Sequence, residues 1–260
     1  MKRTSLTTSQ RDLLETLIGK HGLVVTTQDI MAPLGFATEE SKYRFVSQLC
    51  EAGWLVRIKH GLYQIADVSS LGSFTLSRFT IASLLHPESY VSFLTALQFH
   101  GLFDQSLQSV SSVSTKRKAA VVLQGIRYRY VMTKEAYYFG FTSHAMDAQR
   151  VQIAQAEKAL VDLMQFHRTG TTVDLVLETL RDNHHQLDLK RLIAYAQRSP
   201  VAVQRVLGFL LEALHLETGE LAQAAQSSQS VTRLSRESSQ FSSTWRLYYD
   251  PYFIRDLIGA

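Results

Sequence analysis

The side chains best suited to chemistry in this sequence lie between residues 41 and 51, where polar groups recur at helical spacing. Ser41, Arg44, Gln48 and Glu51 are three or four residues apart, so a helix would carry them on one face. A guanidinium can bond both acceptors of a guanine edge in the DNA major groove, and a glutamine amide can bond an adenine edge. This spacing predicts a base-reading surface on Arg44 and Gln48, with Ser41 beside them.

A short basic segment follows this stretch. Arg57, Lys59 and His60 precede Gly61, between two apolar segments at residues 54–58 and 62–65 that are typical of β-strands. A glycine suits the tight turn of such a hairpin. We expect Arg57, Lys59 and His60 to meet phosphate groups rather than bases, because cations on an exposed hairpin contact the nucleic-acid backbone.

Helix caps and apolar periodicity predict the elements that would position these groups. Thr26 can cap a first short helix and Thr38 a second, and Gly53 suits the left-handed end of the second. Three apolar side chains of the second helix would be buried: Phe45, Val46 and Leu49. An amphipathic helix over residues 5–20 precedes them, with its apolar face formed by Leu13, Leu14, Leu17 and Ile18.

Helix, turn, helix and hairpin in this order are typical of a winged helix-turn-helix, in which the second helix enters the major groove and the hairpin touches the backbone. The alternative is a winged helix used only for protein contact. Glu39, Glu40 and Glu51 dilute the positive charge of the predicted face. DNA binding is the interpretation that the residue types favour.

A second basic patch is predicted farther along the chain. Lys116, Arg117 and Lys118 follow a valine-containing strand, and Arg127 and Arg129 share one face of another strand at residues 126–131. Such a surface could bind a phosphate backbone, an RNA or an acidic partner. The alternative is a solvated turn beside a polar strand face, and the sequence leaves both open.

Catalytic and metal-binding patterns are not found in the sequence. It has no GxxxxGK[ST] phosphate loop, GxSxG elbow or HExxH pair, and the neighbouring His184 and His185 would point apart on a helix. Glu157 and Lys158 have the residue types of a nuclease site, but adjacent helical side chains diverge by about 100°. We therefore expect no enzyme activity, no metal site and no cofactor.

Length and composition limit the kinds of protein to which this chain can belong. The chain has 260 residues, enough for two domains, and a net charge of +4, a mild basic bias compatible with nucleic acid. Its one cysteine, Cys50, is expected to be a buried small hydrophobe in a reducing compartment. No apolar run has the length of a membrane span and no apolar signal region opens the chain, so a cytoplasmic location is expected.

Polar and small residues at 67–73 suggest a boundary between a domain at 1–70 and a second at 71–260. In the second domain we expect helices at 76–85 and from 89 to 100, then strands at 110–113, 121–123, 126–131, 138–142 and 151–154. Helices follow at 156–167, 172–181, 188–197 and 200–215, then a Ser/Gln-rich loop or loosely held helix at 226–244 and a closing strand at 245–249. The expected fold class is α+β: a winged helix-turn-helix followed by a mixed α/β domain with a helical C-terminal part.

Several segments together resemble the AbiEi-type antitoxins of type IV toxin–antitoxin and abortive-infection systems, which act in phage defence. They are LVRIKHGLYQI at 55–65, VSFLTALQFHGLFDQ at 91–105, VSSVSTKRK at 110–118, IAQAEKALVDLMQF at 153–166, LGFLLEAL and WRLYY, and they occur in the family's order. The resemblance implies an autorepressor that binds inverted repeats of double-stranded DNA in its own promoter and counteracts, directly or indirectly, a nucleotidyltransferase-like toxin encoded beside it. Carried onto this sequence, the DNA-reading positions are the 41–51 helix, which adds Lys42, and the 57–63 wing, which adds Tyr63.

Two further hypotheses compete with a DNA-binding antitoxin. A protein-interaction module could neutralise a toxin by direct binding without reading DNA, and an exposed apolar patch on the helices from 156 to 215 would favour it. A metal-dependent nuclease acting through Glu157 is the third.

Overall fold

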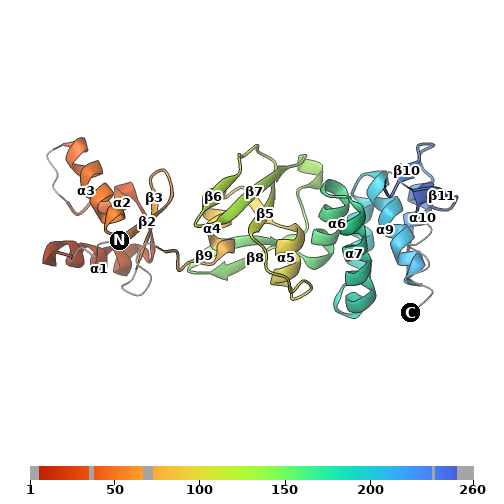
Figure 1. Cartoon of the computed structure of the whole chain (residues 1–260), viewed down its shortest axis with the longest axis horizontal. Coiled ribbons are helices and arrows are strands. Elements are labelled where there is room, and N and C mark those ends of the chain that lie inside the picture. Colours follow the sequence, from red (N-terminus) through yellow and green to blue (C-terminus); the bar gives the residue numbers. More distant parts are fainter. Residues whose placement is uncertain (1–5, 35–37, 67–72, 236–237, 251–260) are drawn as a thin grey trace. The chain divides into compact units, whose positions relative to one another are not determined.

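The computed structural model describes residues 6–34, 38–66, 73–235 and 238–250. The chain divides into two compact units (Figure 1). The winged-helix unit comprises residues 1–87 together with 122–126 and 145–151, and the C-terminal unit comprises 88–121, 127–144 and 152–260. Most of the predicted linker, residues 67–72, lies outside the described residues, and the boundary at residue 70 stays a prediction.

The winged-helix unit has the predicted helices and hairpin in the predicted order, and it adds a short strand at Val24–Thr26 that the sequence does not predict. Its elements are α1 (Thr8–His21), β1 (Val24–Thr26), α2 (Thr27–Met31), α3 (Glu39–Glu51), β2 (Leu55–Lys59) and β3 (Leu62–Ile65). Thr26 caps α2 in a reciprocal capping box with Asp29, and Thr38 caps α3 by accepting the Ser41 N–H. The three strands form an antiparallel sheet in the order β1-β3-β2. Gly53, with φ 82°, ends the turn after α3.

One hydrophobic core holds this unit together. It includes Leu13, Leu14 and Leu17 of α1, Val25, Ile30, Val46, Leu49, Leu55, Tyr63 and Ile65. Phe45 and Cys50 are only partly buried against it, whereas the sequence predicts both as buried. Ile18, placed on the apolar face of the first helix, is 43% exposed. It lies near the end of α1, where the core no longer covers it.

Helix α4 (Arg78–Leu85) is anchored at both of its ends within the winged-helix unit. At its start the Asp147 carboxylate accepts the Ser77 N–H at 2.8 Å and the Thr80 hydroxyl at 2.6 Å. Burial raises the pKa of Asp147, but these hydrogen bonds outweigh it, so the pKa lies below its ordinary value. At its end the Lys59 ammonium of β2 donates to the Leu84 carbonyl at 2.6 Å.

A six-stranded sheet in the order β6-β7-β5-β4-β9-β8 follows. Its strands are β4 (Ser89–Val91), β5 (Ser109–Ser114), β6 (Val121–Leu123), β7 (Ile126–Met132), β8 (Phe141–Met146) and β9 (Gln149–Ala154). Strand β4 pairs antiparallel with β5 and parallel with β9, and β5 pairs parallel with β7. The helix expected from residue 89 begins at Phe93 as α5 (Phe93–Phe99), and the strand expected at 138–142 begins at Phe141, after a 3-10 turn (Glu135–Tyr137).

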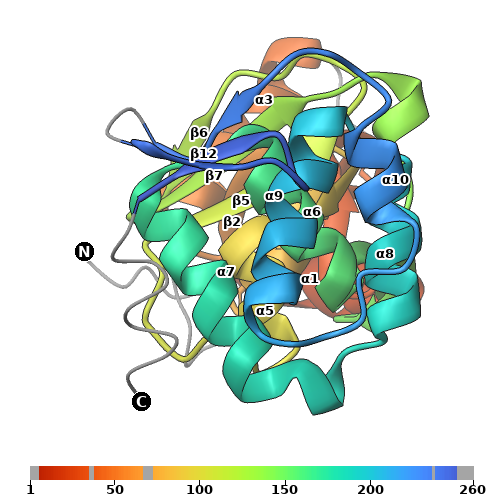
Figure 2. The ribbon, with the colours of Figure 1, turned by 90° about the vertical axis from the view of Figure 1, so that its right-hand side faces the viewer.

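The helices of the C-terminal unit surround α6 (Ala156–Phe166), which contacts α5, α7, α8 and α9. The elements that follow α6 in the chain are α7 (Gly170–Asn183), a 3-10 turn (His184–Gln186), α8 (Leu189–Gln197), α9 (Val201–Ala213) and α10 (Leu221–Ala225). Figure 2 looks onto these helices, where α9 packs against α6, α8 and α10. Helix α7 begins two residues before the predicted Thr172, because Thr169 is its cap.

An ion pair is buried inside this bundle. Lys158 and Asp162 are one helical turn apart on α6, form a hydrogen-bonded pair, and have fully buried side chains. Asp162 also accepts from the Ser92 hydroxyl at 2.6 Å and from the Tyr90 hydroxyl at 3.1 Å. The Lys158 ammonium lies 4.7 Å from the centre of the Phe139 ring. Burial raises the pKa of Asp162, and Lys158 and the two hydroxyl donors oppose that effect.

The Ser/Gln-rich stretch is more ordered than the sequence predicts. It contains β10 (Thr232–Arg233) and β11 (Gln240–Ser242), which flank β12 (Leu247–Tyr249) in a small sheet. Arg205 of α9, 1% exposed, holds the start of this stretch. Its guanidinium donates to the Ala225 and Ser228 carbonyls and to the hydroxyls of Ser230 and Thr232.

A close approach between Gly208 and Trp245 joins α9 to the segment before β12. A Cβ atom at position 208 would lie 1.9 Å from Cζ3 of the Trp245 indole. Trp245 is fully buried, and its Nε1–H donates to Glu212 at 2.6 Å. Only glycine leaves room for the ring at this point of α9.

Candidate nucleic-acid interface

Helix α3 presents the predicted base-reading side chains to solvent. Ser41, Arg44 and Gln48 are exposed, while Val46 and Leu49 on the other side are buried in the core. Lys42 is half-buried. The cap at Thr38 and the apolar pair at 46 and 49 fix the rotation of the helix, so the exposed stripe follows directly from the sequence pattern.

The wing places its polar groups at different depths. Arg57 and His60 are exposed, and the Arg57 Nη2 lies 3.2 Å from the His60 Nδ1. Lys59 is half-buried and donates to the Leu84 carbonyl. Tyr63 is 8% exposed and belongs to the hydrophobic core. Arg57 and His60 are therefore the wing side chains that solvent, and hence a phosphate, can reach most readily.

A pocket of about 330 Å³ lies between α3 and the wing, and we call it the α3–wing pocket. Its lining residues are Thr27, Tyr43, Val46, Ser47, Cys50, Arg57, His60 and Tyr63. The sequence does not predict this pocket, although Tyr43, Ser47 and Cys50 recur at the spacing of one helical stripe. Burial raises the pKa of the Cys50 thiol, and the nearby Arg57 guanidinium opposes that effect.

The second basic patch lies on two separate elements of the C-terminal unit. Lys116, Arg117 and Lys118 follow β5, and the Lys116 ammonium pairs with Glu88 at 2.7 Å across an exposed surface. Arg127 and Arg129 are exposed on one face of β7, as the alternation predicts. Arg129 is close enough to His167 to reinforce the lowering of its pKa, which burial mainly causes.

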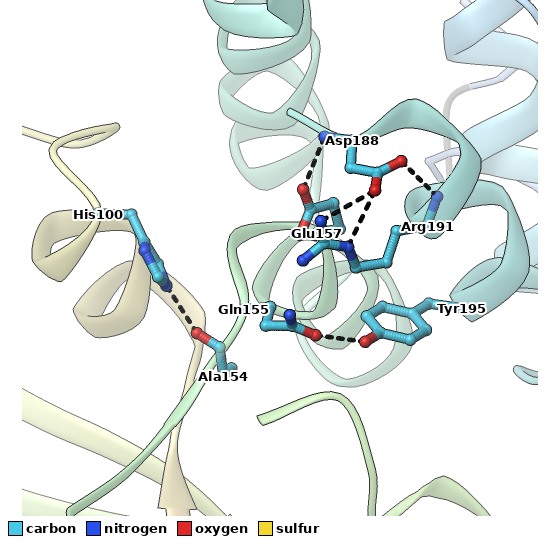
Figure 3. Close-up of polar contacts among 7 residues, drawn as sticks. All are labelled: His100, Ala154, Gln155, Glu157, Asp188, Arg191 and Tyr195. Carbon is cyan, nitrogen blue, oxygen red and sulfur yellow. Dashed lines mark hydrogen bonds and ion pairs between the residues drawn. The ribbon is translucent and has the colours of Figure 1, made fainter. Parts of the chain in front are cut away.

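Glu157 and Lys158, the pair considered for a nuclease, both make structural contacts. Lys158 pairs with Asp162, as described above. Glu157, 4% exposed, accepts the Asp188 N–H at 2.8 Å and lies 4.0 Å from Arg191, which itself bonds Asp188 at 2.9 Å (Figure 3). These contacts join the first turn of α6 to the first turn of α8.

Two neighbouring hydrogen bonds extend this polar cluster. The Tyr195 hydroxyl of α8 donates to the Gln155 side chain, and the His100 Nε2–H donates to the Ala154 carbonyl at 2.8 Å (Figure 3). Across the described ranges of the chain, no three His, Cys, Asp or Glu side chains lie together in a way that could hold a metal ion. The contacts in Figure 3 connect the end of β9 and the start of α6 with α8.

The N-terminal part of the chain is similar to a known protein family. Residues 12–66 match a family model described as "Transcriptional regulator, AbiEi antitoxin". This confirms the AbiEi resemblance over α1 to β3, and the mixed α/β architecture with a winged-helix start is the fold class expected from the sequence. No curated protein matches the chain.

A solved structure shares the fold over nearly the whole chain. The crystal structure of the RV2827C protein from Mycobacterium tuberculosis superposes with a TM-score of 0.67 at 15% sequence identity, covering 98% of this chain and 96% of that one. At this identity the likeness concerns the fold alone. Among the residues that the structure describes, no helix has both the length and the apolar character of a membrane span.

Proposed function

We propose that this protein is a DNA-binding antitoxin that represses its own operon from inverted repeats in the promoter. The observation that carries the proposal is the exposed stripe of Ser41, Arg44 and Gln48 on α3, beside a hairpin with Arg57 and His60 at its surface. The match of residues 12–66 to antitoxin transcriptional regulators supports it. Two copies on an inverted repeat would block polymerase.

In the proposed mechanism α3 enters the major groove and the wing lies against the backbone. Arg44 bonds a guanine edge and Gln48 an adenine edge, while Ser41 and Lys42 contact the flanking backbone. Arg57 and His60 bond phosphates. Lys59 contributes charge near the same phosphates while it stays bonded to Leu84.

The second basic patch is the other candidate phosphate surface. Lys116, Arg117, Lys118, Arg127 and Arg129 would add to the counterion release on binding, without reading bases. Double replacement of Arg127 and Arg129 by glutamine should reduce the slope of log affinity against log salt by about two if both contact phosphates. An unchanged slope would assign them to a solvated strand face.

The antitoxin part of the proposal is that the protein counteracts a cognate nucleotidyltransferase-like toxin in the cytoplasm, directly or indirectly, without catalysis, a metal or a cofactor of its own. The support is the antitoxin description of the matching family. Co-expression with the product of the neighbouring gene should restore growth. A chain lacking residues 71–260 should fail to do so, if the second domain carries the antitoxin function.

The test of DNA binding compares the upstream fragment with random DNA across a salt series. We expect a preference for the upstream fragment and a linear fall of log affinity with log salt. Arg44→Ala should cost about 1–3 kcal/mol on the upstream fragment and relax base preference. Arg11→Ala, which removes the same charge from the exposed face of α1, is the matched control and should leave the preference intact.

Equal losses on both DNAs for Arg44→Ala would refute its base-reading role. No preference at any salt would favour the protein-interaction module instead. That alternative predicts an exposed apolar patch on the helices from 156 to 215. The exposed large hydrophobic side chains of the described residues are Ile18, Leu23, Tyr43, Val122, Met132, Val231 and Phe241, and all of them lie outside that range.

A further inference from the structure

The α3–wing pocket has the chemistry of an anion site. Among the described residues that line it, none is Asp or Glu, whereas Arg57 supplies a permanent positive charge. Thr27, Tyr43 and Ser47 add hydroxyl groups, and Cys50 adds a thiol. The lining itself contains no carboxylate, and Arg57, Thr27 and Tyr43 offer donors to an anion, whereas the Ser47 hydroxyl donates to Glu51 beside the pocket at 3.3 Å.

The contact between Arg57 and His60 defines the donors more closely. A guanidinium has only N–H donors, so the His60 Nδ1 at 3.2 Å must be the acceptor. In a neutral ring with this tautomer, the proton is on Nε2. The pair thus leaves further guanidinium N–H groups and the imidazole Nε2–H as donors on the wing.

A second pocket of the molecule differs from the α3–wing pocket in the charge of its lining. It has about 340 Å³, lies between α7 and the segment after α5, and is lined by Asp104, Glu178 and Asp182 among others. Carboxylates disfavour an anion there, and nothing else at that site points to a ligand. The two pockets are similar in size and opposite in charge.

Size and apolar lining narrow the ligand class for the α3–wing pocket. Small-molecule sites usually measure about 300–1,000 Å³, and this one lies within that range. A bare phosphate would leave most of the pocket empty, since one water accounts for roughly 30 Å³ of liquid volume. Tyr43, Val46 and Tyr63 supply the aromatic and aliphatic surface that an organic body would cover.

We propose that the α3–wing pocket binds a small organic anion, a carboxylate or phosphate carried on a flat apolar body, and that this ligand competes with DNA. Tyr43, Ser47 and Cys50 line the pocket from the same helix that carries Arg44 and Gln48, and Arg57 belongs to both sites. An occupant would neutralise a phosphate-binding group and fill the space between the recognition helix and the wing. The competition rests on the proposed DNA binding, but the ligand site does not.

Cys50 provides a built-in reporter for the test, because it is the only cysteine of the chain and lines the pocket. The full-length protein is alkylated with iodoacetamide at mildly alkaline pH, and the rate is followed by mass spectrometry. The probe is phenyl phosphate, and inorganic phosphate and benzyl alcohol supply the anion and the apolar body separately. We expect phenyl phosphate to slow alkylation severalfold and saturably at millimolar concentration, and the two partial probes to have much weaker effects.

Two variants show whether the pocket is responsible. Arg57→Gln should abolish the protection, whereas Arg11→Gln, with the same charge loss on α1, should keep it. Each variant is compared with its own rate without ligand, because Arg57 also affects the reactivity of Cys50. Both side chains are exposed, so neither replacement removes core packing.

Three results would overturn the ligand site: no saturable protection, equal protection by inorganic phosphate, or undiminished protection in Arg57→Gln. The effector role has a separate readout, since phenyl phosphate should raise the Kd for upstream DNA over the concentration range in which it protects Cys50. Protection of Cys50 with an unchanged Kd would refute the competition. Protection in a protein that binds no DNA would refute the proposed function and leave the ligand site standing.

Discussion

Replacing Gly208 by alanine should destabilise the C-terminal unit strongly. The new Cβ would lie 1.9 Å from Cζ3, 2.2 Å from Cη2 and 2.6 Å from Cε3 of Trp245, so the indole has to move. The ring is fully buried and cannot turn into solvent. Overpacking of a core typically costs about 1–3 kcal/mol. Displacing the indole also weakens its hydrogen bond to Glu212, a kind worth about 1.5–3 kcal/mol.

Together these effects predict a loss of about 3–5 kcal/mol in the free energy of unfolding, allowing for partial relaxation. The assay is urea unfolding followed by tryptophan fluorescence in a Trp54→Phe background, so that Trp245 is the remaining reporter. Gly170→Ala is the matched control, because its Cβ meets no atom within 4 Å and it lies in the same unit at the start of α7. It should be neutral or stabilising by up to about 1 kcal/mol.

A double-mutant cycle with Trp245→Leu isolates the clash, and because the leucine variants lose the fluorescent reporter, urea unfolding of all four proteins is followed by far-UV circular dichroism instead. The single leucine variant loses core packing, but in combination with Gly208→Ala the new methyl group occupies space that the indole has vacated. The double variant should therefore lose less stability than the sum of the two single losses. Additive losses, or a Gly208→Ala variant as stable as Gly170→Ala, would refute the packing argument.

Three other perturbations have clear expectations. Lys158→Met or Asp162→Leu alone should cost about 3–5 kcal/mol in urea unfolding, because each leaves an unpaired buried charge. The double replacement should recover only part of this loss, because the buried Tyr90 and Ser92 hydroxyls lose their acceptor; a double variant no more stable than the singles would contradict it. The Thr26 hydroxyl and backbone N–H hold the pKa of Asp29 below its usual value of about 3.9. The ionised carboxylate should therefore stabilise the folded protein fully above about pH 3.9, and this stabilisation should disappear as the pH falls through the lowered pKa. Asp29→Asn should remove this acid-range dependence, and an identical pH profile of both proteins would argue against the capping box as its cause. Arg57→Gln should weaken upstream and random DNA alike and reduce the salt slope by about one, and a loss confined to upstream DNA would instead make Arg57 a base reader.

The winged helix could be predicted from the sequence because its signals are local. Thr26 and Thr38 cap their helices through residues three positions away, and Gly61 permits the hairpin turn with φ 73°. The exposed stripe on α3 follows from the same periodicity. The α3–wing pocket could not be predicted, because it depends on how closely β2 approaches α3, and that distance is set by core packing.

In the C-terminal unit, the features that the sequence does not predict depend on contacts between distant segments. Residues 89–91, Ser-Tyr-Val, are compatible with a helix or a strand, and β4 forms because β5 and β9 lie on either side of it. Lys158 and Asp162 have the spacing of an exposed helical ion pair, yet Tyr90 and Ser92 from another segment bury and satisfy it. The residues next to α6 in the sequence do not indicate that Tyr90 and Ser92 contact this ion pair.

The contacts of Arg205 explain how a stretch of such low complexity can belong to an ordered unit. Three of its five hydrogen bonds go to main-chain carbonyl oxygens, which every amino acid supplies. The chain path over residues 225–228 is therefore held in large part through its backbone, and the exposed side chain of Ser227 can vary without loss of the fold. We expect random mutagenesis to tolerate substitutions at Ser227 far better than any at Arg205 or at Gln226, whose side-chain amide donates to the Ser243 and Thr244 carbonyls at 2.8 and 2.7 Å.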